Sequence, residues 1–182
     1  GLKILLLKKT VVSFDNISND VLSKLLTNKS QAVREKSFEL LNELSTTELL
    51  KRQELVMECC LSPYHDVRVN IRPVIKRMSD ENKDFGTAAF NWLLPSLLRK
   101  ESHEGLQKDV KDILINELMG FVNNADKEMV LRLIYADYVP AQEFGIAVLE
   151  KYIDPSSFTI RQIIALGNHE TLSVREWCWK YF

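Results

Sequence analysis

The residues of this chain that could do chemistry are few, and their spacing joins them into no recognisable reactive set. His65, His103 and His169 lie in separate parts of the sequence, and no metal-ligand spacing connects them. Cys59 and Cys60 are adjacent, so on a helix their side chains would point about 100° apart, and no C-x-x-C motif is present. Glycine-rich phosphate loops and G-x-S-x-G elbows are absent too. We therefore expect exposed histidines, buried thiols, no catalytic residues, no bound metal and no cofactor.

Acid pairs and the remaining cysteine add no reactive site. Asp109 and Asp112, and Asp80 and Glu81, are interpreted as solvated charges on helix faces or in turns. Three cysteines, two of them adjacent, do not form a disulfide framework, and reduced thiols are typical of the cytoplasm. The opening apolar run, residues 4–7, is too short for a signal peptide or a membrane span. We expect a cytoplasmic protein without membrane contact.

Basic residues make the most interesting pattern. Arg68, Arg72 and Lys76 are spaced i, i+4, i+8 and would line one side of a helix, while Arg34 and Arg175 occupy the position of Arg68 in two other segments. One interpretation is a patch that binds an acidic peptide or a phosphate, because arginine forms bidentate contacts with both. The alternative is that the three repeated arginines bind turn carbonyls or acids of adjacent repeats, and that Arg72 and Lys76 lie on a solvated face.

A five-fold internal repeat supplies the elements that must position these residues. Its anchors are Val33, Val67, Leu106, Ala141 and Val174, which are 34, 39, 35 and 33 residues apart. Apolar or small residues follow at offsets 0, 4, 7, 8 and 11, which together form one face of an α-helix. Ser37 and Glu117 are mild misfits. Another apolar helical run precedes each segment, so the unit is a first helix, a short polar turn and a second helix.

Helix-end signals agree with this unit. Ser45 to Glu48 and Ser173 to Glu176 match capping boxes, and Asp154 precedes a proline as an N-cap would. Pro73 and Pro95 lie inside predicted helices and should kink them.

The step Asp66-Val67-Arg68 at the start of a second helix, with the repeat length and offsets, resembles HEAT repeats of the HEAT/armadillo type. The resemblance implies an all-α fold, a right-handed α-solenoid of about five helix pairs with the second helices on its concave face. We expect one domain, residues 1–182, with repeats at 18–45, 46–79, 80–121, 124–152 and 155–182 and residues 1–17 as a remnant of a preceding helix. The third repeat departs most, which predicts a longer loop or a change in curvature around residues 80–104.

The tryptophans fall into two groups, one predicted core residue and a cluster with other aromatic residues in the last predicted helix. Trp92 falls within an apolar helix and is predicted to lie in the core. Trp177, Trp179, Tyr181 and Phe182 leave the last repeat with an aromatic end instead of the usual polar cap. We expect a terminal interface here, where the chain continues in a larger protein or packs on another copy.

Composition and net charge favour protein binding over nucleic-acid binding. The 182 residues are 46% hydrophobic and 27% charged, with a net charge of −1, which is not the basic character of a dedicated nucleic-acid binder. The leading hypothesis is a non-catalytic scaffold that binds a protein or peptide partner, acidic if the arginine patch is used. The alternative is a nucleic-acid-binding helical repeat protein, including a solenoid like the DNA glycosylases. An accessory role like that of the HEAT-like lyase and maturation factors is the third.

Overall fold

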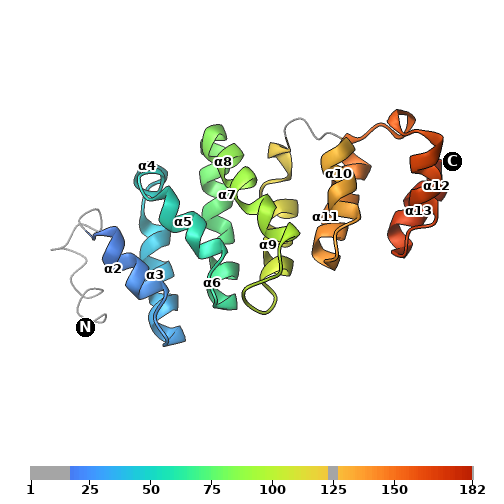
Figure 1. Cartoon of the computed structure of the whole chain (residues 1–182). Helices are drawn as coiled ribbons and strands as arrows, with labels where there is room; N and C mark the ends of the chain where they lie inside the picture. Colours follow the sequence, from blue (N-terminus) through green and yellow to red (C-terminus); the bar gives the residue numbers. More distant parts are fainter. Residues whose placement is uncertain (1–16, 123–126, 182) are drawn as a thin grey trace.

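The computed structural model describes residues 17–122 and 127–181, and throughout these ranges the chain is helical with no β-strand (Figure 1). This confirms the predicted all-α class. The predicted remnant of a preceding helix, apart from Ile17, and the terminal Phe182 lie outside the described residues.

The helices follow one another as pairs joined by short turns. The first pair is α2 (Asn19–Leu26) and α3 (Gln31–Glu43). In the second, both members are divided, into α4 (Thr46–Leu50) with α5 (Gln53–Cys60), and α6 (His65–Asn70) with α7 (Arg72–Glu81). The third consists of α8 (Lys83–Leu93), its 3-10 continuation η2 (Leu94–Leu98), α9 (Leu106–Asn116) and the short 3-10 turn η3 (Met119–Phe121). The fourth is α10 (Lys127–Ile134) with α11 (Val139–Tyr152), and the fifth is η4 (Pro155–Ser157), α12 (Ile160–Gly167) and α13 (Leu172–Tyr181).

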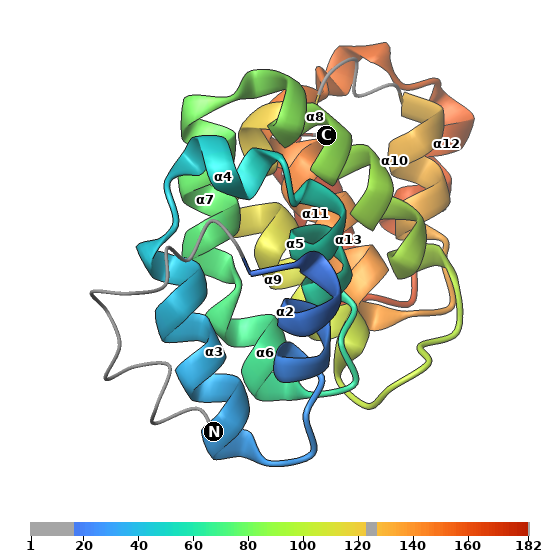
Figure 2. The ribbon, with the colours of Figure 1, turned by 90° about the vertical axis from the view of Figure 1, so that its left-hand side faces the viewer.

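The pairs lie side by side in chain order. Figure 1 shows them as a row from α2 to α13, and Figure 2 looks along this row from its N-terminal end. The second helices pack in succession, α3 on α6, α6 on α9, α9 on α11 and α11 on α13. Each pair therefore contacts mainly the pair before it and the pair after it.

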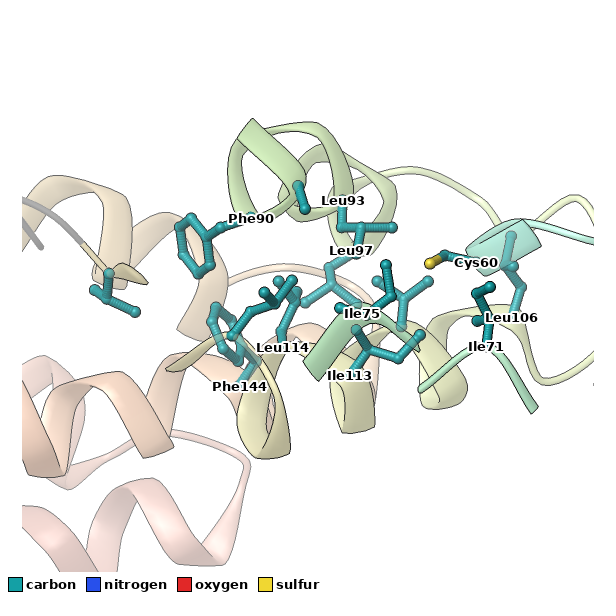
Figure 3. Packing of buried hydrophobic residues seen from close by; sticks show 14 of the residues in the cluster. Cys60, Ile71, Ile75, Phe90, Leu93, Leu97, Leu106, Ile113, Leu114 and Phe144 are labelled. Carbon is teal, nitrogen blue, oxygen red and sulfur yellow. The ribbon is translucent and has the colours of Figure 1, made fainter. Parts of the chain in front are cut away.

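One apolar core runs through the row. In the second repeat the residues at the five repeat offsets, Val67, Ile71, Val74, Ile75 and Met78, are all buried. Side chains from successive pairs meet there, as Figure 3 shows for Ile75, Ile113, Leu114 and Phe144. In the fourth repeat Gly145 brings α10 and α11 together, because a Cβ at this position would lie 2.9 Å from the Leu133 Cβ. The repeat offsets thus identify the buried face of the second helices.

Prolines account for two irregular helices. Pro73 has no N–H for a carbonyl one turn earlier, and the second helix of its repeat is broken at Ile71 into α6 and α7. Pro95 lies where α8 tightens into the 3-10 helix η2. The long third repeat is filled mostly by this extended first helix, so its loop is confined to residues 99–105.

The helix caps agree with the sequence only in part. Ser45 caps α4 by accepting a hydrogen bond from the Glu48 N–H, but the Glu48 side chain pairs with Lys51 instead of closing the box. Ser173 lies inside α13, so the second predicted capping box is wrong. The reciprocal box in the last repeat is formed by Thr159 and Gln162 at the start of α12.

Trp92 is not a core residue. Its side chain is 39% exposed, whereas Leu93 and Phe90 on the same helix are buried. Helix α8 carries more apolar residues than the face that contacts its neighbours can cover, and Trp92 lies outside that face.

Candidate interaction surface

The residue that follows each repeat anchor bonds to the backbone of the turn before its helix. In the three repeats that have arginine at this position, Nη1 donates to the carbonyl oxygen six residues earlier, as in the 2.7 Å bond from Arg68 to the Ser62 oxygen. Arg34 and Arg175 also donate to the carbonyl five residues earlier. The other members of the set are Arg34 with Asn28 and Lys29, Gln107 with Leu97 and Arg99, Gln142 with Ala136, and Arg175 with His169 and Glu170. These long side chains satisfy turn carbonyls that would otherwise lack partners.

Arg34 also joins the first repeat to the second. Its Nε and Nη2 donate to the two carboxylate oxygens of Asp66 at 2.9 and 2.8 Å, a bidentate ion pair, and its guanidinium lies 3.9 Å from the centre of the Tyr64 ring. The hydrogen bond with Asp66 raises the pKa of Arg34 above its ordinary value. All polar contacts of this guanidinium are therefore within the protein.

Arg68 makes the equivalent connection from the second repeat to the third. Its Nε donates to Asp109 Oδ2 at 2.7 Å and its Nη2 to the Glu104 oxygen at 3.1 Å. His65 Nδ1 lies 2.8 Å from the same carboxylate oxygen. Arg68 is 1% exposed and Asp109 is buried with it, so the interpretation of Asp109 as a solvated charge was wrong.

These contacts remove most of the predicted basic patch. Arg34 and Arg68 are buried, and the pairing is the one expected from the alternative interpretation of the repeated arginines. Arg72 pairs with Glu117 of the third repeat at 2.9 Å, and the exposed Lys76 pairs with Asp80 one turn away. The five predicted binding residues thus do not form one continuous surface of free positive charge.

In the described ranges no group of three or more His, Cys, Asp or Glu side chains could hold a metal ion. His65 and His103 are exposed as expected, but His169 is buried, with Nδ1 accepting from the Thr171 N–H and its ring beside Tyr135. Cys59 and Cys60 are buried as predicted. Burial raises the pKa of the Cys59 thiol to about 12, so almost none of it is thiolate at neutral pH.

The aromatic C-terminal cluster divides into buried and exposed parts. Trp177 is buried, with its ring edge-on to Phe158 and beside Tyr181. Trp179 points away from this core and is 62% exposed. Only part of the predicted terminal interface is therefore available to another molecule.

An apolar surface that the sequence did not identify lies on α12. The sequence places Ile160, Ile163 and Ile164 together in the apolar run of a first helix. In the structure Ile160 is 78% and Ile164 59% exposed, and Leu166 is the only buried residue of this helix. Helix α12 is amphipathic, but the neighbouring helices cover only part of its apolar side, which leaves Ile160 and Ile164 exposed.

A hollow of about 370 Å³ lies between α10 and α12, and the residues that follow Ile160 and Ile164 in the chain line it. Its lining residues are Leu131, Tyr135, Arg161, Gln162 and Ala165. Arg161 is exposed and has no ion-pair partner among the residues that the structure describes. Together, Ile160, Ile164, Arg161 and the hollow make up what we call the α12 surface.

A second, more polar hollow of about 470 Å³ lies at the turns of the last two repeats, between Tyr135, Asp137, Gln142 and His169. Gln142 is held there by a hydrogen bond from the Thr171 hydroxyl. Its lining contains no serine or cysteine that His169 could activate, so we assign it no chemistry.

Within residues 17–122 and 127–181, none of the helices combines the length and the apolar character that crossing a bilayer requires. Comparisons of the chain with protein-family models, with curated proteins and with solved structures found no match. The HEAT-like resemblance therefore rests on the repeat pattern of the chain itself.

Proposed function

We propose that this chain is a right-handed α-solenoid of five HEAT-like helix pairs and that it acts as a non-catalytic scaffold for a protein partner. The order of the pairs, the succession of packed second helices and the repeated arginine or glutamine at the turns all support this reading. A stack of this kind presents long outer faces to its partners rather than one deep catalytic cleft. The free, buried cysteines support a cytoplasmic location.

The observation that carries the proposal is the α12 surface. Two isoleucines one turn apart are mostly exposed, and the residues that follow them, Arg161 and Ala165, line a hollow that offers space for an apolar side chain. Exposed apolar residues that gather in one place, with polar residues at the rim, are typical of protein-binding sites. A partner helix or extended segment would bury Ile160 and Ile164 and place an apolar side chain in the hollow.

Arg161 predicts that the partner carries a negative charge at this contact. Arg161 lines the hollow and is exposed, so an aspartate or glutamate of the partner could form a bidentate ion pair with it. An acidic partner was expected from the arginine patch on the second helices. The same chemistry is now assigned to the α12 surface, because Arg34 and Arg68 are used inside the protein.

The second-helix face has weaker support as a binding site, for a peptide or for nucleic acid. Arg72 and Lys76 are paired with acids of this chain, and an incoming phosphate or carboxylate would have to compete with them. Glu39, Asp80 and Glu150 are exposed on the second helices too, and their negative charge repels nucleic acid.

The test is capture of the partner followed by substitution. The intact chain would carry a photoreactive amino acid in place of Ala165, in the hollow, and the cross-linked protein would be identified and purified. The double variant Ile160→Lys with Ile164→Lys should weaken binding of that protein at least tenfold, because it introduces two charges at the centre of the contact. The matched control is Val21→Lys with Val69→Lys, two valines exposed to a smaller extent on the first two repeats.

Arg161→Glu should weaken the same complex, and more so at low salt. The proposal fails if the cross-linked protein binds both lysine double variants equally well. It also fails if the chain turns over a substrate at the α12 surface.

A further inference from the structure

Among the residues that the structure describes, one face of α13 is left largely uncovered. It contains Leu172, Arg175, Glu176 and Trp179, and it lies opposite the buried Val174 and Cys178. Leu172 is 52% and Trp179 62% exposed, Glu176 is exposed and Arg175 is half-buried. The spacing of three, one and three residues places all four on adjoining positions of one helical face.

In each of the four preceding repeats, the residue at the position of Trp179 is either buried or ion-paired. Five residues after the anchor, the first four repeats have Phe38, Arg72, Lys111 and Ile146. Phe38 and Ile146 are buried. Arg72 and Lys111 form ion pairs with Glu117 and Glu143 of the following repeat. In the last repeat the same position has an exposed tryptophan.

The position of Arg175 shows the same difference. Arg34 and Arg68 each bind a carboxylate of the following repeat, Asp66 and Asp109. Arg175 binds only its own turn carbonyls, and no carboxylate contacts it in the part of the chain that the structure describes. Its Nε, which donates to the carboxylate in both Arg34 and Arg68, makes no such contact here and can pair with an external acid.

We propose that a second copy of this chain covers this face, with the two α13 helices packed antiparallel about a two-fold axis. The point midway between Leu172 and Trp179 in the sequence is also the point midway between Arg175 and Glu176. A two-fold axis opposite that midpoint therefore brings Leu172 to Trp179 of the second copy and Arg175 to Glu176 of the second copy at the same time. Symmetry repeats both contacts, giving two apolar pairs that flank two ion pairs.

Stacking on the first repeat of another copy is a less suitable arrangement. In that repeat the positions of Asp66 and Asp109 are occupied by Ala32 and Lys36. Lys36 would place a positive charge near Arg175 where the other repeats have a carboxylate. The antiparallel arrangement instead provides Glu176, which is exposed and has no ion-pair partner among the described residues.

The dimer should be weak. One helix face from each chain buries less than the roughly 1,600 Å² of a standard interface, which predicts micromolar or weaker dissociation. The face is separate from the α12 surface, so the inference goes beyond the proposed function and each can fail alone.

Sedimentation equilibrium of the 182-residue chain between about 10 µM and about 1 mM tests the association. The average mass should rise from the 21.1 kDa of the monomer toward twice that value. Trp179→Glu should shift the dissociation constant at least tenfold, and Glu176→Arg should do the same, because it faces Arg175 of the second copy. The matched control is Trp92→Glu, an exposed tryptophan on α8, which should leave the association unchanged.

Disulfide trapping tests the register. Chains with Leu172→Cys, mixed with chains with Trp179→Cys and a mild oxidant, should form the mixed disulfide dimer, in which the other Trp179–Leu172 contact is intact. The native cysteines are buried and should not react. A chain that stays monomeric at about 1 mM overturns the proposal, and so does a dimer that Trp179→Glu leaves unchanged. Rapid trapping of Leu172→Cys with itself overturns the antiparallel register.

Discussion

Replacing Arg68 with methionine tests whether the buried arginines hold neighbouring repeats together. The substitution keeps the apolar stem but removes the charge and three hydrogen bonds, to Asp109, the Ser62 oxygen and the Glu104 oxygen. Asp109 then remains buried with His65 as its nearest partner. Breaking a buried ion pair by removing one member costs about 3–5 kcal/mol, and we expect a loss of about 4 kcal/mol in the free energy of unfolding.

This loss is large, because natural domains are stable by only about 5–15 kcal/mol. It would be measured by urea unfolding followed by far-ultraviolet circular dichroism. The control is Lys76→Met, which breaks an exposed ion pair on α7 of the same repeat and should cost less than about 1 kcal/mol.

A second variant separates the charge from the packing. Arg68→Met together with Asp109→Leu removes both charges and should recover most of the stability, because apolar residues often replace a buried ion pair without loss. If Arg68→Met costs no more than Lys76→Met, the buried arginine contributes nothing beyond a surface charge. The assigned role of the repeated arginines would then be wrong.

Three further outcomes follow from the packing. Gly145→Ala should destabilise the fold by about 1 kcal/mol or more in the same urea assay, since its methyl group would crowd Leu133, whereas Gly120→Ala, with no atom within 4 Å, should not. Thr159→Ala should cost about 1 kcal/mol through loss of the cap, and faster hydrogen exchange confined to α12 would show it, whereas unchanged exchange would contradict it. Cys59 should react with thiol reagents only when the protein unfolds. The pKa of its thiol is higher in the folded than in the unfolded protein, so its contribution to stability should be present below about pH 9 and be lost as the pH rises toward about 12.

Much of the fold could be predicted from the sequence, because a helix repeats every 3.6 residues and its buried face is visible in one segment. The anchors from Val67 to Val174 identify the second helices, and Pro73 identifies a break. Helix ends were less certain: Ser173 looks like an N-cap, but α13 has already begun before it. The choice between two cap residues a few positions apart depends on the loop, which has no periodicity.

The candidate site was the part that the sequence predicted poorly. Arg68 and Asp109 are far apart in the chain, and their pairing depends on how two repeats stack. Exposure of Ile160 and Trp92 was missed for a related reason: neighbouring helices cover only part of the apolar surface of the helix on which each lies. Which of these residues are buried is decided by the neighbouring helices, and a single segment does not contain that information.

The arginine–carboxylate contacts also restrict the order in which repeats can follow one another. Arg34 pairs with Asp66, which lies immediately before the anchor of the next repeat. Arg68 pairs with Asp109, which lies three residues after the anchor of the next repeat. A duplicated second repeat would still offer Asp66 to the arginine before it. If the fourth repeat followed the second, Pro140 and Phe144 would occupy those two positions, and Arg68 would be buried without a carboxylate. Chimeras in which repeats are exchanged should therefore fold only when each buried arginine is followed by a repeat that carries its acid.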